Sequence, residues 1–157
     1  GTRTRFGTEF IWPFGPASLK SEWLRMQFED LQNDGTEEDI DFTGWYVSGT
    51  YFLTGEKKTL GRVIPLRSFN PYEGGWGAWE IAARYAVLES DDDLFEQGFA
   101  TGTDRAQAYT IGLNWYLNPY LRMIFDFEHT EFDEDVFIDG EAVDDENVFF
   151  AQWQLEF

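Results

Sequence analysis

Side chains alternate between apolar and polar along several segments that are long for β-strands. Between residues 107 and 117, tyrosine, isoleucine, leucine and tryptophan fill odd positions, while Thr110, Gly112 and Asn114 lie between them. A period of two is the repeat of a β-strand with two unlike faces. The segments have about 9–13 residues, whereas ordinary strands have about five or six and a tilted membrane-crossing strand needs about 9–11. The pattern predicts an all-β protein, an antiparallel transmembrane sheet with lipid on one face and water on the other.

We predict seven strands of this kind. They span Arg5–Trp12, Leu19–Glu29, Phe42–Thr54, Ala78–Leu88, Gln107–Leu117, Tyr120–Thr130 and Val148–Phe157. Single-chain bacterial barrels have an even number of strands, about eight or more, so seven strands do not close a barrel. We expect residues 1–157 to be the C-terminal part of one barrel domain. N-terminal strands, a partner chain or an eighth strand within Gly55–Gly77 would complete it.

Composition excludes several classes of function. The chain has no cysteine and one histidine, His129, which excludes cysteine-based and multi-histidine metal centres. The net charge of −19 argues against a nucleic-acid partner, because phosphate backbones need basic surfaces. Asp126 and Glu128 alternate with His129 along one strand, so the histidine points away from both. No nucleophile–base arrangement or phosphate-binding glycine loop is visible, and we expect neither an enzyme nor a bound cofactor.

Hydropathy is compatible with a membrane barrel. No apolar run approaches the ~20 residues of a transmembrane helix, and the mean hydropathy is negative. Both facts are expected for a barrel, in which only every second residue faces lipid. Aromatic residues make up 19% of the chain and suit the rims of such a wall, where we place Trp12, Trp45, Tyr116 and Tyr120. Residues 1–4 have no signal-peptide character, so we expect a leader that was removed or a start within a longer chain.

Acidic residues gather in three segments after the second, fourth and sixth strands. These are Asp30–Asp41, Glu89–Asp104 and Glu131–Glu146, which hold 21 of the 30 acidic residues and no lysine or arginine. We predict three long loops at one end of the sheet, because an up-and-down chain places every second connection at the same end. Bacterial barrels have long outer loops and short periplasmic turns, so we expect the acidic end to be extracellular.

Carboxylates within these segments are candidate Ca²⁺ ligands, because Ca²⁺ takes about six to eight oxygens. The candidates are Asp91, Asp92, Asp93, Asp133 and Asp135. None has the spacing of an EF-hand. The alternative is a set of solvated charges that repel anions at the channel mouth.

Basic residues are candidate anion contacts within the channel. We assign Arg25, Arg84 and Arg122 to the polar faces of their strands, where a guanidinium attracts anions and keeps its charge. The alternative is a structural ladder, in which these arginines pair with acidic residues assigned to the same faces. Those acidic partners are Glu29, Glu80, Asp126 and Glu128.

The connection Gly55–Gly77 belongs to the end with short turns, yet it has more than twenty residues. It contains Lys57, Lys58, Arg62 and Arg67. A connection this long often has a functional reason. It either folds inward and narrows the channel with a positive field, or extends into the periplasm with solvated charges.

The last predicted strand places Trp153, Leu155 and Phe157 on one face. Alternating apolar residues that end on an aromatic residue resemble the sorting signal that the barrel-assembly machinery reads. The alternative is an ordinary last strand of a soluble barrel.

Four stretches resemble, in order, motifs of the phosphate-selective porin O/P family. They are residues 44–56 (GWYVSGTYFLTGE), 62–65 (RVIP), 77–85 (GAWEIAARY) and 111–119 (IGLNWYLNP). The resemblance runs from about Thr43 to Phe157. It implies a sixteen-stranded barrel in the bacterial outer membrane, usually a homotrimer, that passes phosphate or other anions through a basic constriction. The chain would then supply about the last seven strands.

The leading hypothesis is a porin that lets small hydrophilic solutes diffuse passively across the outer membrane. Its partners would be the lipid bilayer, small inorganic anions and the assembly machinery. One alternative is a non-conducting barrel that anchors a larger structure. The other is a soluble β-sandwich that binds carbohydrate on exposed aromatic rings, against which the strand lengths and the one-ended acidic segments argue.

Overall fold

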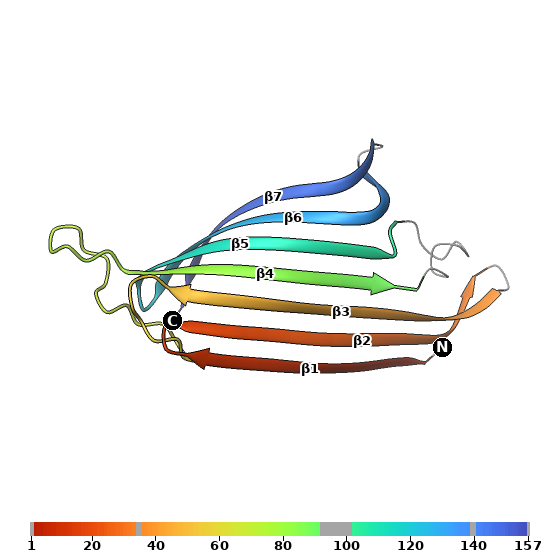
Figure 1. Ribbon diagram of the computed structural model, residues 1–157, viewed down its shortest axis with the longest axis horizontal. Helices are drawn as coiled ribbons and strands as arrows, with labels where there is room; N and C mark the ends of the chain where they lie inside the picture. Colours follow the sequence, from red (N-terminus) through yellow and green to blue (C-terminus); the bar gives the residue numbers. More distant parts are fainter. Residues whose placement is uncertain (1, 34–35, 92–101, 139–140, 157) are drawn as a thin grey trace.

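A single antiparallel sheet of seven strands makes up the fold (Figure 1). The computed structural model describes residues 2–33, 36–91, 102–138 and 141–156. The strands are β1 (Arg3–Phe14), β2 (Ala17–Asn33), β3 (Thr36–Phe52), β4 (Ala78–Ser90), β5 (Arg105–Asn118), β6 (Leu121–Ile138) and β7 (Glu141–Leu155). Each strand pairs with its sequence neighbours, in the order β1 to β7. The seven predicted strands and their up-and-down order are confirmed.

The connections divide between the two ends of the sheet (Figure 1). The β2–β3 and β6–β7 hairpins lie at one end, the hairpin end, where the Ser90 N–H also donates to the Asp104 carbonyl at 2.8 Å. The β1–β2 turn, the β5–β6 turn and residues 53–77 lie at the other, the turn end. Gly15 in the first turn has a φ of 60°, which glycine adopts without steric cost. The prediction that the acidic segments share one end is confirmed.

The prediction that the acidic segments are loops is wrong for Asp30–Asp41 and Glu131–Glu146. β2 reaches Asn33 and β3 begins at Thr36, while β6 reaches Ile138 and β7 begins at Glu141. Backbone pairing continues through both hairpins after a register shift, although acidic residues are depleted in strands. In the third segment, Glu89–Asp104, residues 92–101 lie outside the described part.

Residues 53–77 contain no strand, so the eighth strand considered there is absent. They hold one isolated bridge between Asn70 and Gly75. Among the residues that the structure describes, no helix is long and apolar enough to cross a membrane.

The strand register fixes two unlike faces. Residues that pair across adjacent strands form rows that run across the sheet. One such row is polar, and the row one residue away along each strand is apolar. The polar row is Ser48, Arg84, Thr110 and Glu128, and the apolar row is Gly49, Ala83, Ile111 and Phe127. The alternation predicted for the fourth to sixth strands is therefore confirmed.

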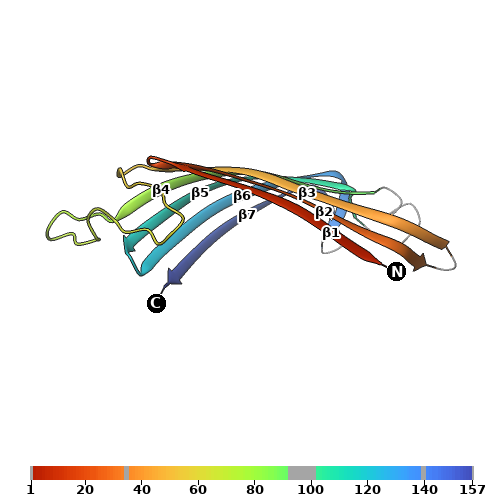
Figure 2. The ribbon, with the colours of Figure 1, turned by 90° about the horizontal axis from the view of Figure 1, so that it is seen from below.

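The polar face is the concave one. Figure 2 shows that the sheet is curved and that the chain from about residue 56 to 63 lies on its concave side. Lys58 of that segment pairs with Glu80 on the polar face. Val63 packs against Phe52, Ala78 and Tyr116, which belong to the same face.

The apolar face is convex and has no covering layer in the described part of the chain. Ile111, in its middle, is 63% exposed. A β-sandwich needs a second sheet about 10 Å away, whereas the described residues form one layer. The sandwich alternative therefore finds no support here, and an apolar face of this size indicates an apolar environment.

Candidate functional site on the concave face

Aromatic rings on the convex face form two belts that define the height of the wall. The belt nearer the hairpin end runs across the sheet, with centroid distances of 5.5 Å for Trp45–Tyr85 and 4.9 Å for Tyr85–Tyr109. The belt nearer the turn end contains Trp79 and Trp115, which stack at 4.8 Å. Trp79 and Tyr85 are six residues apart, about 20 Å at about 3.3 Å per residue, close to the ~25 Å apolar band of outer-membrane barrels.

The prediction that Arg25 and Glu29 lie on the polar face is wrong. Arg25 pairs across the sheet with Thr43 and forms an ion pair with Asp41 on the convex side. Glu29, four residues further along β2, shares that side by alternation. Both lie beyond the hairpin-side belt, and neither faces the concave side.

Arg84 and Arg122 do lie on the concave face, as predicted. The Arg84 guanidinium stands 3.9 Å from the centroid of the Tyr46 ring. Arg122 donates to the Tyr116 hydroxyl at 3.1 Å and to the Gln154 side-chain oxygen. Neither arginine has a carboxylate within ion-pair distance among the described residues. The Arg122 Nε is buried and without a hydrogen-bond partner there.

The predicted ladder of arginines and carboxylates does not form. Glu80 pairs with Lys58 instead, at 2.5 Å. Glu128 accepts a hydrogen bond from the Thr110 hydroxyl at 2.8 Å. Asp126 lies beside Gly112, where a Cβ would meet its carboxylate, so the glycine makes room for it. The two arginines therefore keep their positive field on the concave face.

The segment after β3 is fastened to the concave face by buried polar groups. The Glu56 side chain is buried and accepts the Leu66 N–H at 3.0 Å. The Lys58 N–H donates to the Gly15 carbonyl at 2.7 Å. Arg62 lies 3.6 Å from the Glu156 carboxylate and 5.0 Å from the Tyr120 ring centroid.

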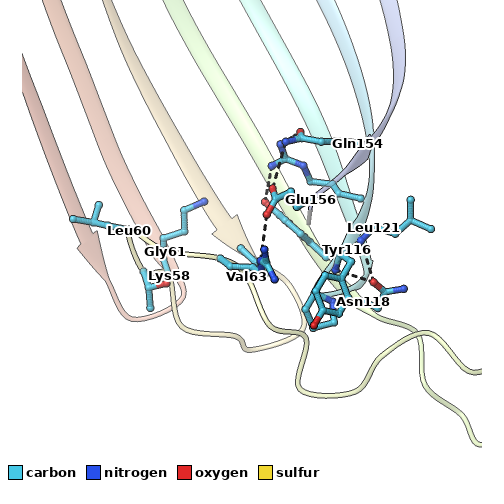
Figure 3. Close-up of a pocket in the computed structure, with 14 residues that line it drawn as sticks. Lys58, Leu60, Gly61, Val63, Tyr116, Asn118, Leu121, Gln154 and Glu156 are labelled. Carbon is cyan, nitrogen blue, oxygen red and sulfur yellow. Dashed lines mark hydrogen bonds and ion pairs between the residues drawn. The ribbon is translucent and has the colours of Figure 1, made fainter.

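This segment borders an open pocket of about 440 Å³ at the turn end (Figure 3). Its lining combines Lys58, Arg62 and Arg122 with Tyr116, Gln154 and Glu156. The predicted position of Tyr116 at a membrane rim is wrong. Tyr116 is buried on the concave face and donates its hydroxyl to Glu80 at 2.8 Å. Its even position in β5, opposite to that of Trp115, was the available signal.

The four basic residues of Gly55–Gly77 separate into two groups. Lys58 and Arg62 lie on the concave side, as the inward alternative proposed. Arg67 lines a different recess with Ser68, Asn70 and Glu73, in the part that extends past the sheet. Lys57 is exposed. The inward course therefore holds for Lys58 and Arg62 and not for the part of the connection that contains Arg67.

The acidic hairpin end offers no metal centre among the residues that can be described. Asp91 accepts the Asp41 N–H at 2.8 Å, and Asp133 lines a shallow recess with Asp41 and Arg105. Asp135 is exposed, and Asp92 and Asp93 lie outside the described residues. No group of three carboxylate or histidine ligands comes together in this part.

His129 lies on the convex face, opposite to Asp126 and Glu128, as its position in the strand predicted. Its Nδ1 is 3.0 Å from the Asn147 side-chain oxygen, and its ring lies beside Tyr109. Trp153 and Leu155 are exposed on the same face, while Phe157 lies outside the described residues.

Comparison with known proteins gives two matches. The family model described as phosphate-selective porin O and P matches residues 1–157. The chain is 31% identical over 122 residues to Porin O of Pseudomonas aeruginosa, an alignment that covers 75% of this chain and 27% of that protein. The chain therefore spans well under half the length of this relative.

Proposed function

Because the chain belongs to the family of phosphate-selective porins O and P, we propose that it forms part of the wall of an outer-membrane channel. Small hydrophilic solutes, anions among them, diffuse through this channel passively. The observation that carries the proposal is the pairing of an apolar convex face, on which Ile111 is mostly exposed, with a concave face that holds Arg84 and Arg122 without carboxylate partners among the described residues. A wall between hydrocarbon and water needs those two faces.

Arg84 and Arg122 act on anions at two depths. Arg84 pairs across the sheet with Thr110, and Arg122 pairs with Tyr116, six residues further along β5. That separation is about 20 Å at about 3.3 Å per residue. A guanidinium keeps its charge at all relevant pH values, and in a confined lumen it replaces part of an anion's hydration. The ring of Tyr46 and the hydroxyl of Tyr116 hold the two groups in place without neutralising them.

Further strands complete the barrel in this proposal. β1 and β7 are the edges of the described sheet, and an unpaired backbone group in lipid costs several kcal/mol. We therefore expect strands from a longer chain to pair with both edges, in a sixteen-stranded barrel that forms a homotrimer. The hairpin end faces the cell exterior, following the rule for bacterial barrels. Residues 148–157 are read by the assembly machinery.

Neutralising either concave arginine is expected to reduce anion preference. One charge acts on a permeant ion about 7 Å away with about 0.6 kcal/mol in water, which corresponds to roughly threefold in permeability ratio. Arg84→Gln and Arg122→Gln in the full-length protein should each shift the reversal potential in a salt gradient across a planar bilayer. Arg25→Gln and Arg105→Gln are the matched controls. Arg25 lies on the convex face, and Arg105 shares that face because the strand register joins it through Glu89 to Thr43, the partner of Arg25. Equal shifts in all four variants, or no shift in any, would contradict the assignment.

Substitutions of Arg62 and Arg67 are expected to differ in their effect on anion preference, although the two residues are only five positions apart. Arg62→Gln removes a cation from the turn-end pocket and leaves Glu156 uncompensated, so anion preference should fall. Arg67→Gln changes a charge outside that pocket, so the reversal potential should stay as in the unmodified protein. The same bilayer measurement tests both. An effect of Arg67→Gln as large as that of Arg62→Gln would show that the whole connection faces the lumen.

A further inference from the structure

The second half of the connection, residues 66–76, carries aromatic rings past the end of the sheet. Figures 1 and 2 show this part of the chain extending beyond the strands at the turn end. Tyr72 at its tip is 98% exposed, and Trp76 and Leu66 are also exposed. Such a run of exposed apolar side chains is unusual for a loop in water.

The tip of this segment is an ordered turn. The N–H groups of Asn70 and Gly75 donate to each other's carbonyl oxygens at 2.9 Å. The Asn70 side chain accepts the Tyr72 N–H at 3.2 Å and donates to Glu73 at 2.9 Å. Gly75 has no room for a Cβ beside the Ser68 carbonyl. The fold therefore holds the backbone of Tyr72 in a defined turn, and no described residue packs against its ring.

Leu66 is tied to Glu56 by its N–H, and beyond it the segment is attached to the convex face. Phe69 packs edge-on against Trp115 at a centroid distance of 5.1 Å, and its N–H donates to the Leu117 carbonyl at 2.6 Å. The Trp76 carbonyl accepts both indole N–H groups of the turn-side belt, from Trp115 at 2.7 Å and from Trp79 at 3.2 Å. Residues 66–76 thus continue the aromatic belt of the face that we assign to lipid.

We infer that residues 66–76 form an interfacial anchor that lies in the phospholipid headgroup region of the leaflet at the turn end. The inference rests on the proposed membrane function. Aromatic rings with a polar group are most stable at the boundary between hydrocarbon and water, which is where the Phe69–Trp115 contact brings Tyr72 and Trp76. Arg67 lies within the same segment and is exposed, so it can meet lipid phosphates. The connection therefore does two things: its first half narrows the lumen, and its second half holds the wall at its depth in the bilayer.

Spin labelling of the full-length protein in phospholipid vesicles tests this anchor. Residues 1–157 contain no cysteine, so single cysteines are introduced by Tyr72→Cys, Ile111→Cys and Leu60→Cys in a cysteine-free background. Each label is probed with oxygen, which concentrates in lipid, and with a nickel chelate, which stays in water. Ile111 represents the lipid-facing wall, and Leu60, which lines the turn-end pocket, represents water. The ratio of oxygen to nickel accessibility at position 72 should be several times that at position 60 and below that at position 111.

The outcomes separate the anchor from the channel proposal. A ratio at 72 equal to that at 60, with a high ratio at 111, overturns the anchor and leaves the membrane wall standing. Low accessibility to both reagents at 72 also overturns it, because protein then covers the ring. A low ratio at 111 as well overturns the membrane placement and the anchor together.

Discussion

Ile111→Arg is expected to destabilise the full-length protein in lipid by about 2–4 kcal/mol, the effect of an arginine near the midplane of a barrel's lipid face. Ile111 lies between the two aromatic belts, close to the middle of the apolar band. Its side chain is mostly exposed on the convex face, so the substitution removes little packing. The loss therefore reports the transfer of a charge into hydrocarbon. Denaturant unfolding of the protein in vesicles, followed by tryptophan fluorescence, measures it.

Asn114→Arg is the matched control on the other face. Asn114 is three residues away on β5, on the concave side, and pairs across the sheet with Glu80. An arginine there stays in water and close to a carboxylate, so the free energy of unfolding should change by less than about 0.5 kcal/mol. If the two variants unfold alike, the two faces of β5 see the same solvent. The assignment of lipid to the convex face would then be lost.

β5 was predictable because its alternation does not change along its length. Every apolar position on its convex face has a polar or small neighbour on the other face, so the register of a single residue decides both faces. Proline or glycine residues mark the two short connections, the β1–β2 turn and the β5–β6 turn. Strand number, order and the facing of Arg84 and Arg122 follow from these local patterns.

β2 was misread because its apolar residues change sides within the strand. Leu19 and Trp23 are odd, whereas Leu24, Met26 and Phe28 are even. Beyond the hairpin-side belt the convex face becomes charged, and Arg25 pairs there with Asp41. The concave face becomes apolar at the same height, with Phe28 and Phe42 in contact. The rule that charged residues face the channel fails for the part of a strand that extends past the membrane.

The two acidic hairpins were missed for a related reason. Acidic residues disfavour strands in general, so their runs read as loops. A hairpin that continues an existing ladder needs only backbone hydrogen bonds. Such bonds do not depend on side-chain type, so the sequence pattern does not reveal them. The inward fold of residues 56–63 was equally hidden, because it depends on Glu80, a residue more than twenty positions away in the chain.

Because the inward fold of residues 56–63 depends on Glu80, we expect Lys58→Met to have the second large effect on stability. The Glu80 side chain is 1% exposed, whereas that of Lys58 is 21% exposed. Removing the ammonium group leaves a buried carboxylate with the Tyr116 hydroxyl as its remaining donor among the described residues. Breaking a buried ion pair from one side costs about 3–5 kcal/mol, and we expect about 3 kcal/mol here because Tyr116 still donates. Denaturant unfolding in vesicles measures this loss.

Adding Glu80→Gln to the Lys58→Met protein should recover most of that stability. A neutral amide needs no counter-charge, and its oxygen still accepts from Tyr116, so the two substitutions are strongly non-additive. The channel supplies a second readout. In Lys58→Met alone the segment 56–63 loses one of its ties to the wall, the ion pair with Glu80, and single-channel conductance should rise as the lumen widens. If Lys58→Met matches the unmodified protein in both stability and conductance, packing of Val63 and the Glu56 hydrogen bonds hold the segment, and the ion pair contributes nothing to the constriction.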